Sequence, residues 1–227
     1  MINYEALSEW EAILIMGLGF AAVLVIGQLL YRLFGIWPGH TRKFMHIGVG
    51  AVCLLFRYPF QNHWIVLGSV VFFIWILWIT RRKTLLTALH REDIQSEGDW
   101  LLPVAIFLNF LLLRHYDYAL LYYLPMLILT LSDPAAFYGG YSFGRTGKSI
   151  PGLLSFLFSA LVICWFFFGY ATNWSTAMRV WAALVVALLG ALTEYLSRKG
   201  WDNITVPIVI GLALILYTEI FVVDGID

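Results

Sequence analysis

Long apolar runs separated by short polar segments fill most of the chain. A helix needs about 20 apolar residues to cross the hydrocarbon core of a bilayer. Eight runs reach or approach that length, near residues 12–31, 44–57, 63–80, 100–114, 118–140, 150–170, 176–195 and 204–222. The run at 44–57 is too short to cross alone and must tilt or borrow flanking residues. The pattern predicts an all-α fold, a polytopic integral membrane bundle of about 7–8 transmembrane helices.

The composition agrees with a membrane protein. Hydrophobic residues make up 61% of the chain, charged residues only 12%, and the mean hydropathy is +0.83. A soluble domain carries roughly twice that charged fraction. No internal repeat or separate soluble domain is visible, so residues 1–227 are expected to form a single transmembrane domain. Cys53 and Cys164 both lie in apolar runs, where small core residues are expected rather than a disulfide.

The basic residues are distributed unevenly between the loops. If the N-terminus lies outside, three of the 14 Lys and Arg residues fall in outside loops: Arg57, Arg114 and Arg179. The remaining 11 of the 14 fall in inside loops: Arg32, Arg42, Lys43, Arg81, Arg82, Lys83, Arg91, Arg145, Lys148, Arg198 and Lys199. Lys and Arg concentrate in the cytoplasmic loops of membrane proteins. We therefore expect an inner-membrane or organelle-membrane protein with its N-terminus outside and the motif loops described below on the cytosolic face. The first apolar run follows an acidic segment, whereas a secretory signal begins with a basic one. We therefore expect this run to remain in the protein as a membrane span.

The stretch GYSFGRTGKSIPG, residues 140–152, resembles the end of a P-loop. A P-loop needs a glycine five residues before the glycine of its Gly-Lys-Ser element, and that position is Ser142. The stretch also lies between two very apolar runs, not between a soluble strand and helix. The P-loop interpretation therefore fails. A glycine-rich basic loop remains, whose Arg145, Lys148 and backbone amides are suited to a phosphate group.

A first polar cluster, HTRKFMH, occupies residues 40–46. In a helix, Arg42 and His46 are four residues apart and Lys43 and His46 three apart, so they share a face. One interpretation is a basic anchor at the membrane surface with an interfacial histidine. The other is an anion site to which the helix N-terminus contributes. Gly48 and Gly50 follow and would allow close helix packing.

A second cluster surrounds Asp133, a carboxylate inside an apolar run. Such a residue costs a few kcal/mol in a bilayer and marks a functional site by default. Pro134 has no N–H to donate and is expected to bias Asp133 away from helical geometry. Ala136, Gly140 and Gly144 recur every four residues and predict a tightly packed face. The alternatives are a structural kink with a packing motif, or a carboxylate that leads into the phosphate-binding loop.

A third cluster, GALTEYLSRKGWDNITVP, contains Glu194, Asp202 and Asn203. Asp202 is suited to cap the following helix, because Asp is favoured at helix N-termini. Two carboxylates and an amide at one helix junction also suit magnesium, which takes one or two carboxylates and leaves its other positions to water and phosphate.

The order of these motifs resembles the dolichol kinase and phytol kinase family, whose members are CTP-dependent polyprenol and lipid kinases of membranes. The elements are RK-x-x-H, S-D-P-x-A-x-x-x-G, G-R…G-K-S-x-x-G, and E followed by D-N-x-x-x-P. The matching residues are Arg42, Lys43, His46, Ser132, Asp133, Pro134, Ala136, Gly140, Gly144, Arg145, Lys148, Ser149, Gly152, Glu194, Asp202, Asn203 and Pro207. Two features depart from the family pattern: only Thr146 and Gly147 separate the G-R and K-S elements, and Pro151 stands where an acidic residue is common. The short chain is closer to the phytol kinase branch.

The resemblance implies transfer of the γ-phosphoryl group of CTP to an isoprenoid alcohol from the bilayer: phytol, farnesol, geranylgeraniol or a polyprenol. It implies catalytic residues Asp133, His46 and Lys148, and Mg²⁺ bound by Asp133, Glu194 and Asp202. The implied nucleotide-binding residues are Arg42, Lys43, Gly140, Gly144, Arg145, Lys148, Ser149, Gly152 and Asn203. Asp133 is our choice for the base, because burial disfavours the ionised form of a carboxyl group. No nucleic acid partner is expected.

Two other functions fit parts of this pattern. A CTP:phosphatidate cytidylyltransferase would use the same metal and nucleotide but attack the α-phosphorus. Its anionic substrate should demand more cationic residues than an alcohol does. A transporter or scaffold would use the intramembrane carboxylates as an ion path. The sequence shows no inverted repeat, and its polar groups collect at one face instead of along a pathway.

Overall fold

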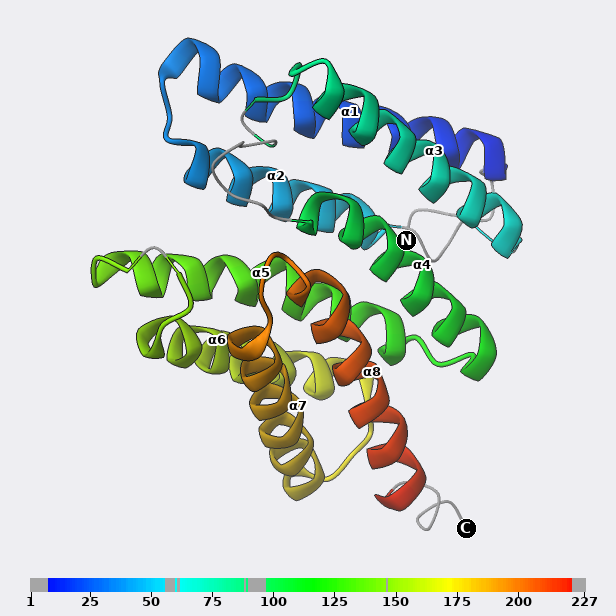
Figure 1. Cartoon of the computed structure of the whole chain (residues 1–227). Helices are drawn as coiled ribbons and strands as arrows, with labels where there is room; N and C mark the ends of the chain where they lie inside the picture. The colour runs from blue at the N-terminus through cyan, green and yellow to red at the C-terminus, as the bar shows by residue number, and fades with distance from the viewer. Residues whose placement is uncertain are drawn as a thin grey trace.

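The computed structural model describes residues 8–55, 60, 62–87, 89, 97–145 and 147–221. This part of the chain forms eight helices and no strand (Figure 1). They are α1 (Glu9–Phe34), α2 (Pro38–Cys53), α3 (His63–Arg82), α4 (Gly98–Tyr116), α5 (Leu120–Ser142), α6 (Ile150–Ala171), α7 (Thr176–Leu196) and α8 (Asp202–Phe221). Each predicted apolar run corresponds to one helix, which confirms the all-α membrane bundle.

Six of the described helices are long and apolar enough to cross a membrane: α1, α3, α5, α6, α7 and α8. The helix α2, with 16 residues, begins earlier than the predicted start at residue 44. It begins at Pro38 because proline is well suited to the first helical turn, where its missing N–H has no partner to lose. The predicted run continued to residue 57, and its last two residues lie outside the described residues.

The helix α5 lies at the centre of the fold and packs against α2, α4, α6 and α8. Close helix contacts surround it. A Cβ atom added at Gly50 of α2 would lie only 2.1 Å from Oγ1 of Thr130 in α5. One added at Gly152 of α6 would lie 2.8 Å from the carbonyl oxygen of Ala136. Small residues therefore let α2 and α6 approach α5 closely, as the sequence predicted for Gly50.

Two predictions about α5 were wrong. Asp133 stays helical, and α5 continues through Pro134 to Ser142, because a packed membrane helix tolerates the loss of one backbone hydrogen bond. Gly144 does not extend the packed face, since a Cβ added there would have no heavy atom within 4 Å. It lies just beyond the helix with φ +69°, a conformation that favours glycine. Gly139 packs instead, with an added Cβ 2.0 Å from Oγ of Ser155.

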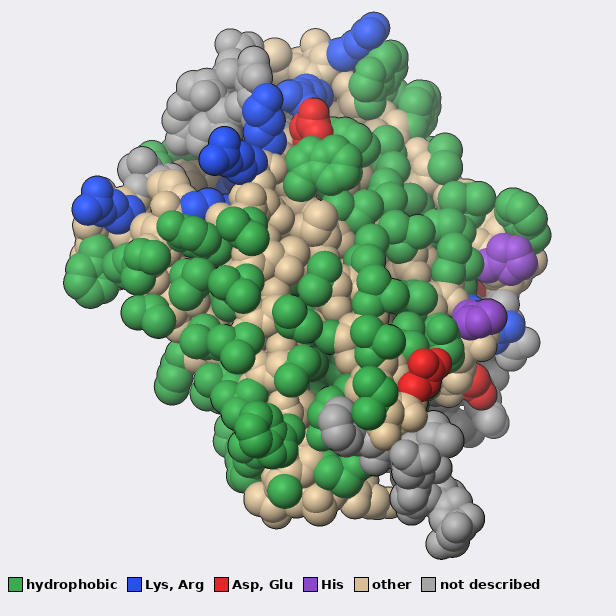
Figure 2. Space-filling model, turned by 60° about the horizontal axis from the view of Figure 1, so that its bottom comes forward, with side chains coloured by type: hydrophobic (Ala, Val, Ile, Leu, Met, Phe, Trp, Pro, Cys, Tyr) green, Lys and Arg blue, Asp and Glu red, His purple; other side chains and the backbone are tan. Residues whose placement is uncertain are grey.

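The helices form layers that position the site. In Figure 1, α1 and α3 lie on one side of α2 and α4, and α5 to α8 lie on the other side. Figure 2 shows Lys and Arg side chains gathered at the upper left, whereas apolar side chains cover the broad surface below. This agrees with the uneven charge distribution in the sequence, although Arg57 and Arg91 lie outside the described residues. Cys53 and Cys164 are free and fully buried, as expected.

Candidate active site

A cavity of about 710 Å³ opens where the loops α5–α6 and α7–α8 meet α2 and α4. Eleven of the predicted site residues line it: Arg42, Lys43, His46, Asp133, Arg145, Lys148, Ser149, Gly152, Glu194, Asp202 and Asn203. They come from motifs as far apart as residues 42 and 203, so the fold brings the three polar clusters together. Gly140 and Gly144 are not in the lining.

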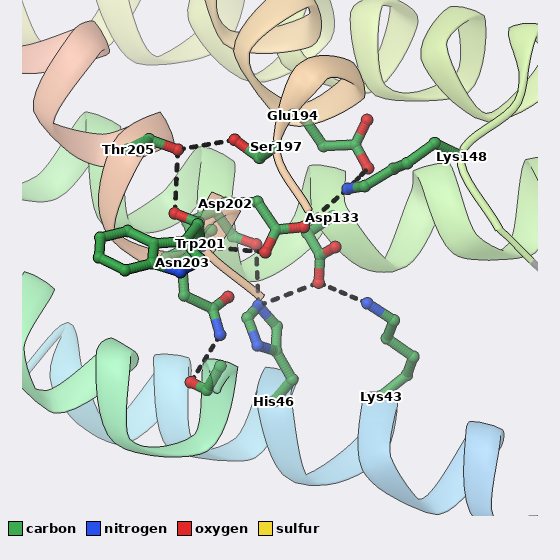
Figure 3. Close-up of polar contacts among 12 residues, drawn as sticks. Lys43, His46, Asp133, Lys148, Glu194, Ser197, Trp201, Asp202, Asn203 and Thr205 are labelled. Carbon is green, nitrogen blue, oxygen red and sulfur yellow. Dashed lines mark hydrogen bonds and ion pairs between the residues drawn. The ribbon is translucent and has the colours of Figure 1, made fainter. Parts of the chain in front are cut away.

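Two side chains of α2 contact the carboxylate of Asp133 (Figure 3). Nζ of Lys43 donates to Oδ2 of Asp133 at 2.6 Å, and Nε2 of His46 lies 3.5 Å from the same oxygen. Nε2 of His46 also lies 3.0 Å from the carbonyl oxygen of Leu129. A carbonyl oxygen only accepts, so this ring nitrogen carries the hydrogen and fixes the tautomer. All three polar side chains are largely withdrawn from solvent.

The ion pair corrects one step of the sequence argument. Asp133 was chosen as the base because burial alone disfavours its ionised form. The ammonium group of Lys43 compensates for that burial and stabilises the carboxylate. The side chain is therefore held as an anion by an ion pair that the sequence did not predict.

Lys148 reaches from the α5–α6 loop to two carboxylates. Its ammonium group donates to Oε1 of Glu194, at the end of α7, and to Oδ2 of Asp202, at the start of α8, the latter at 2.7 Å (Figure 3). Burial opposes the charge on Lys148, but the carboxylates of Asp202 and Glu194 outweigh it and raise the pKa of the lysine above its ordinary value. Lys148 was predicted to meet a phosphate, and here it neutralises carboxylates.

Carboxylate oxygens of Asp133, Glu194 and Asp202 lie within 4.8 Å of one another, and all three residues are buried. Buried oxygen ligands at this spacing suit a hard divalent cation such as magnesium. The three side chains belong to α5, α7 and α8, so tertiary packing creates the cluster. The residues present therefore fit the predicted metal.

Asn203 and Asp202 fix the start of α8 against its neighbours. Nδ2 of Asn203 donates to the carbonyl oxygen of Gly98 at 2.7 Å, which ties α8 to the start of α4. A Cβ added at Gly98 would lie 2.6 Å from Nδ2, so a larger residue there would displace the Asn203 amide. Oδ1 of Asp202 accepts from the backbone N–H of Asn203 at 3.2 Å, while Oδ2 contacts Lys148. Asp202 thus contacts both the next residue of α8 and Lys148.

The glycine-rich loop ends in a capped helix. Ser149 is the N-cap of α6, and its hydroxyl accepts from the N–H of Gly152 at 3.3 Å. Both residues line the cavity, so the positive end of the α6 dipole lies beside it. Gly140 supports the loop from α5, since an added Cβ would lie 2.8 Å from Oγ of Ser149. This geometry gives a phosphate group a favourable place to bind.

Sequence reasoning missed several residues of the lining. Arg198 and Lys199 of the α7–α8 loop contribute to the cavity, and their position just before the D-N element was a usable signal. Trp37 and Phe137 also line it, and the ring of Phe137 lies 5.4 Å from Nζ of Lys43. Nothing in the sequence indicated that α1 and α3 would contribute apolar residues to the cavity lining.

Comparison with known proteins gives one informative match. The chain is 28% identical over 225 residues to a phytol kinase from Synechocystis sp., an alignment that covers 95% of this chain and 94% of the relative. No family model and no solved structure matches the chain. A relation over nearly the whole of both chains confirms the resemblance to the phytol kinase and dolichol kinase family.

Proposed function

We propose that the protein is a lipid kinase that transfers the γ-phosphoryl group of CTP to an isoprenoid alcohol such as phytol. The observation that carries this proposal is the cluster of three buried carboxylates and two lysines in a cavity that also has an apolar part. Phosphoryl transfer needs mainly positioning and neutralisation of charge, which such a cluster can supply. The full-length relation to a phytol kinase supports the choice of reaction.

The carboxylates divide into two roles in this proposal. Glu194 and Asp202 would hold Mg²⁺, which supplies the positive charge that binds and orients the donor's phosphates. Asp133 is assigned as the base, because it lies on the α2 side of the cluster, next to His46. The apolar residues Met45 and Val49 line the cavity from the same helix, so an alcohol held there would bring its hydroxyl to Asp133 first.

The transfer step balances without a further reactant. The hydroxyl oxygen of the alcohol attacks the γ-phosphorus, and the bond from that phosphorus to the β–γ bridging oxygen breaks. CDP leaves with the electron pair, and the hydroxyl proton moves to the carboxylate of Asp133. Lys43 and His46 keep that carboxylate in position. Arg42, Arg145 and the start of α6 are assigned to the phosphates, with Lys148 joining them once it is released from Glu194 and Asp202.

The membrane orientation forms part of the proposal. The cavity opens beside Arg42 of α2 and among loops that carry Arg145, Arg198 and Lys199. Basic loops are typically cytosolic, where nucleotides are present, so we infer that this face of the single transmembrane domain is the cytosolic one.

Product analysis tests the proposal. Purified protein in detergent is incubated with phytol, magnesium and either CTP or ATP, and the products are quantified by mass spectrometry. We expect equal amounts of phytyl monophosphate and CDP, and little product with ATP. Pyrophosphate as the co-product, or reaction with phosphatidate in place of phytol, would instead identify a cytidylyltransferase.

A further inference from the structure

One part of the cavity lining is entirely apolar. The residues that α1 and α3 contribute are Leu24, Phe73 and Leu77, and Met45, Val49 and Leu102 adjoin them from α2 and α4. Leu24, Met45 and Leu77 also form a small buried cluster of their own, apart from the main core. Every charged residue in the described lining comes from elements other than α1 and α3.

The apolar lining residues of α1 and α3 and the three carboxylates lie on opposite sides of the α2 and α4 layer. Figure 1 places α1 and α3 on one side, and α5, α7 and α8, which carry the carboxylates, on the other. Among the described residues, α2 and α4 do not pack extensively against each other, although each packs against a helix on either side. The cavity therefore connects the two sides between α2 and α4, and the neighbouring residues Met45 and His46 of α2 both line it.

We propose that this apolar part binds the isoprenoid chain of the acceptor, and that Leu77 and Phe73 set the chain length that the enzyme accepts. This inference rests on the proposed function and adds a specificity site to it. The occupant follows from the chemistry of the lining: a triphosphate has no partner among Leu24, Phe73 and Leu77, whereas a hydrocarbon chain does. The apolar part and Asp133 line the same cavity, so a chain bound there would place its hydroxyl end at the reacting centre.

Selection at such a site should depend on shape. A chain that leaves the bilayer for an apolar cavity gains no hydrophobic free energy, because lipid tails are equally apolar. Discrimination then comes from van der Waals contact and from exclusion of chains that do not fit. A larger side chain in the cavity should therefore hinder a long alcohol while it leaves a short one almost unaffected.

The first test compares two tryptophan variants of α3. Leu77→Trp fills the cavity, whereas Val71→Trp changes a side chain that is 57% exposed and not part of the lining. Overpacking of a filled site reduces binding by about 10-fold or more, so Leu77→Trp should lower kcat/KM for geranylgeraniol by that factor. Its activity with geraniol should stay close to wild type, which also shows that the variant is folded. If Leu77→Trp fails to fold, Phe73→Trp replaces it, because Phe73 is only half-buried.

A second test needs no turnover. A geranylgeraniol analogue with a diazirine at its far end is photo-crosslinked to the wild-type protein, and labelled peptides are mapped. Label on the α1 and α3 segments that contain Leu24 and Phe73, reduced by Leu77→Trp and not by Val71→Trp, supports the site. Label confined to other helices, or equal effects of the two variants on both alcohols, overturns it. If the expected crosslinks form but the protein transfers no phosphoryl group, the proposed kinase activity is rejected and the chain-binding site is retained.

Discussion

Nζ of Lys148 lies 2.7 Å from Oδ2 of Asp202, and the same ammonium group also donates to Glu194. A lysine from one loop thus neutralises the two carboxylates that we assign to magnesium. Lys148 and a divalent cation therefore compete for the same oxygen atoms. Binding of the nucleotide would settle this competition, because its phosphates offer Lys148 a new partner.

The competition predicts opposite effects of Lys148→Ala on two measurements. Binding of Mn²⁺ alone, followed by electron paramagnetic resonance, should become tighter, because the carboxylates are no longer paired with an ammonium group. Turnover should fall by about 10- to 150-fold, which is the effect expected when one charge-assisted hydrogen bond to the substrate is lost. Lys148→Arg should recover part of the turnover.

Arg81→Ala is the control for that variant, since Arg81 lies at the end of α3 and does not line the cavity. It should leave both measurements unchanged. Weaker Mn²⁺ binding in Lys148→Ala, or equally small effects of the two variants on turnover, would contradict the competition and leave Lys148 as a structural residue.

The carboxylates themselves can be neutralised without loss of shape. Asp133→Asn, Glu194→Gln and Asp202→Asn should each lower turnover by about 100-fold or more, as expected for groups that stabilise transition-state charge. Each variant should still elute as a folded protein in detergent, and Glu194→Gln and Asp202→Asn should also weaken Mn²⁺ binding. Near-normal turnover in two of the three would mean that the cluster is only structural.

The raised pKa of Lys148 predicts how stability depends on pH. A lysine whose folded-state pKa is raised stabilises the protein fully below its unfolded value, about 10.4, and loses this contribution as pH rises through the folded value. The difference in Tm between the wild type and Lys148→Met should therefore be constant from about pH 6 to 9 and shrink only above the ordinary lysine pKa. A difference that shrinks near neutral pH would show that the ion pairs are weaker than the geometry indicates.

The helices were predictable because apolar length alone specifies them. The predicted run 150–170 matches α6 (Ile150–Ala171), and 176–195 matches α7 (Thr176–Leu196), since polar residues flank both. The start of α2 was less predictable, because Pro38 initiates a helix among polar residues that hydropathy does not detect. Pro134 was misjudged because its effect depends on the helices packed around α5, which one segment does not reveal.

The members of the site could be predicted, but their pairings could not. Arg42, Asp133 and Glu194 were each recognisable as charges at the ends of apolar runs or inside them. Lys148 finds its partners 46 and 54 residues away in the sequence, through the packing of α6, α7 and α8. The apolar lining from α1 and α3 was also hidden, because Leu77 resembles any other leucine of a membrane helix.

Membrane sidedness can be tested with single cysteines. A cysteine at Ser197, in the α7–α8 connection, should react with a membrane-impermeant thiol reagent only from the cytosolic side. The same is expected at Thr146, which lies outside the described residues. A cysteine at Asn173, exposed between α6 and α7, should react only from the opposite side. The native Cys53 and Cys164 are buried and should stay unreactive. Labelling of Ser197→Cys from outside would separate the site from cytosolic nucleotide.

The most direct test of the central claim is to follow the α- and γ-phosphorus atoms of CTP separately. Wild-type protein in detergent receives geranylgeraniol, magnesium and CTP that carries a radioactive phosphorus at either the α- or the γ-position, and the lipid fraction is then counted. We predict label in the lipid from the γ-position only, and its loss in Asp202→Asn. Label from the α-position, or no transfer to any isoprenoid alcohol from either position, would contradict the assignment as a CTP-dependent lipid kinase.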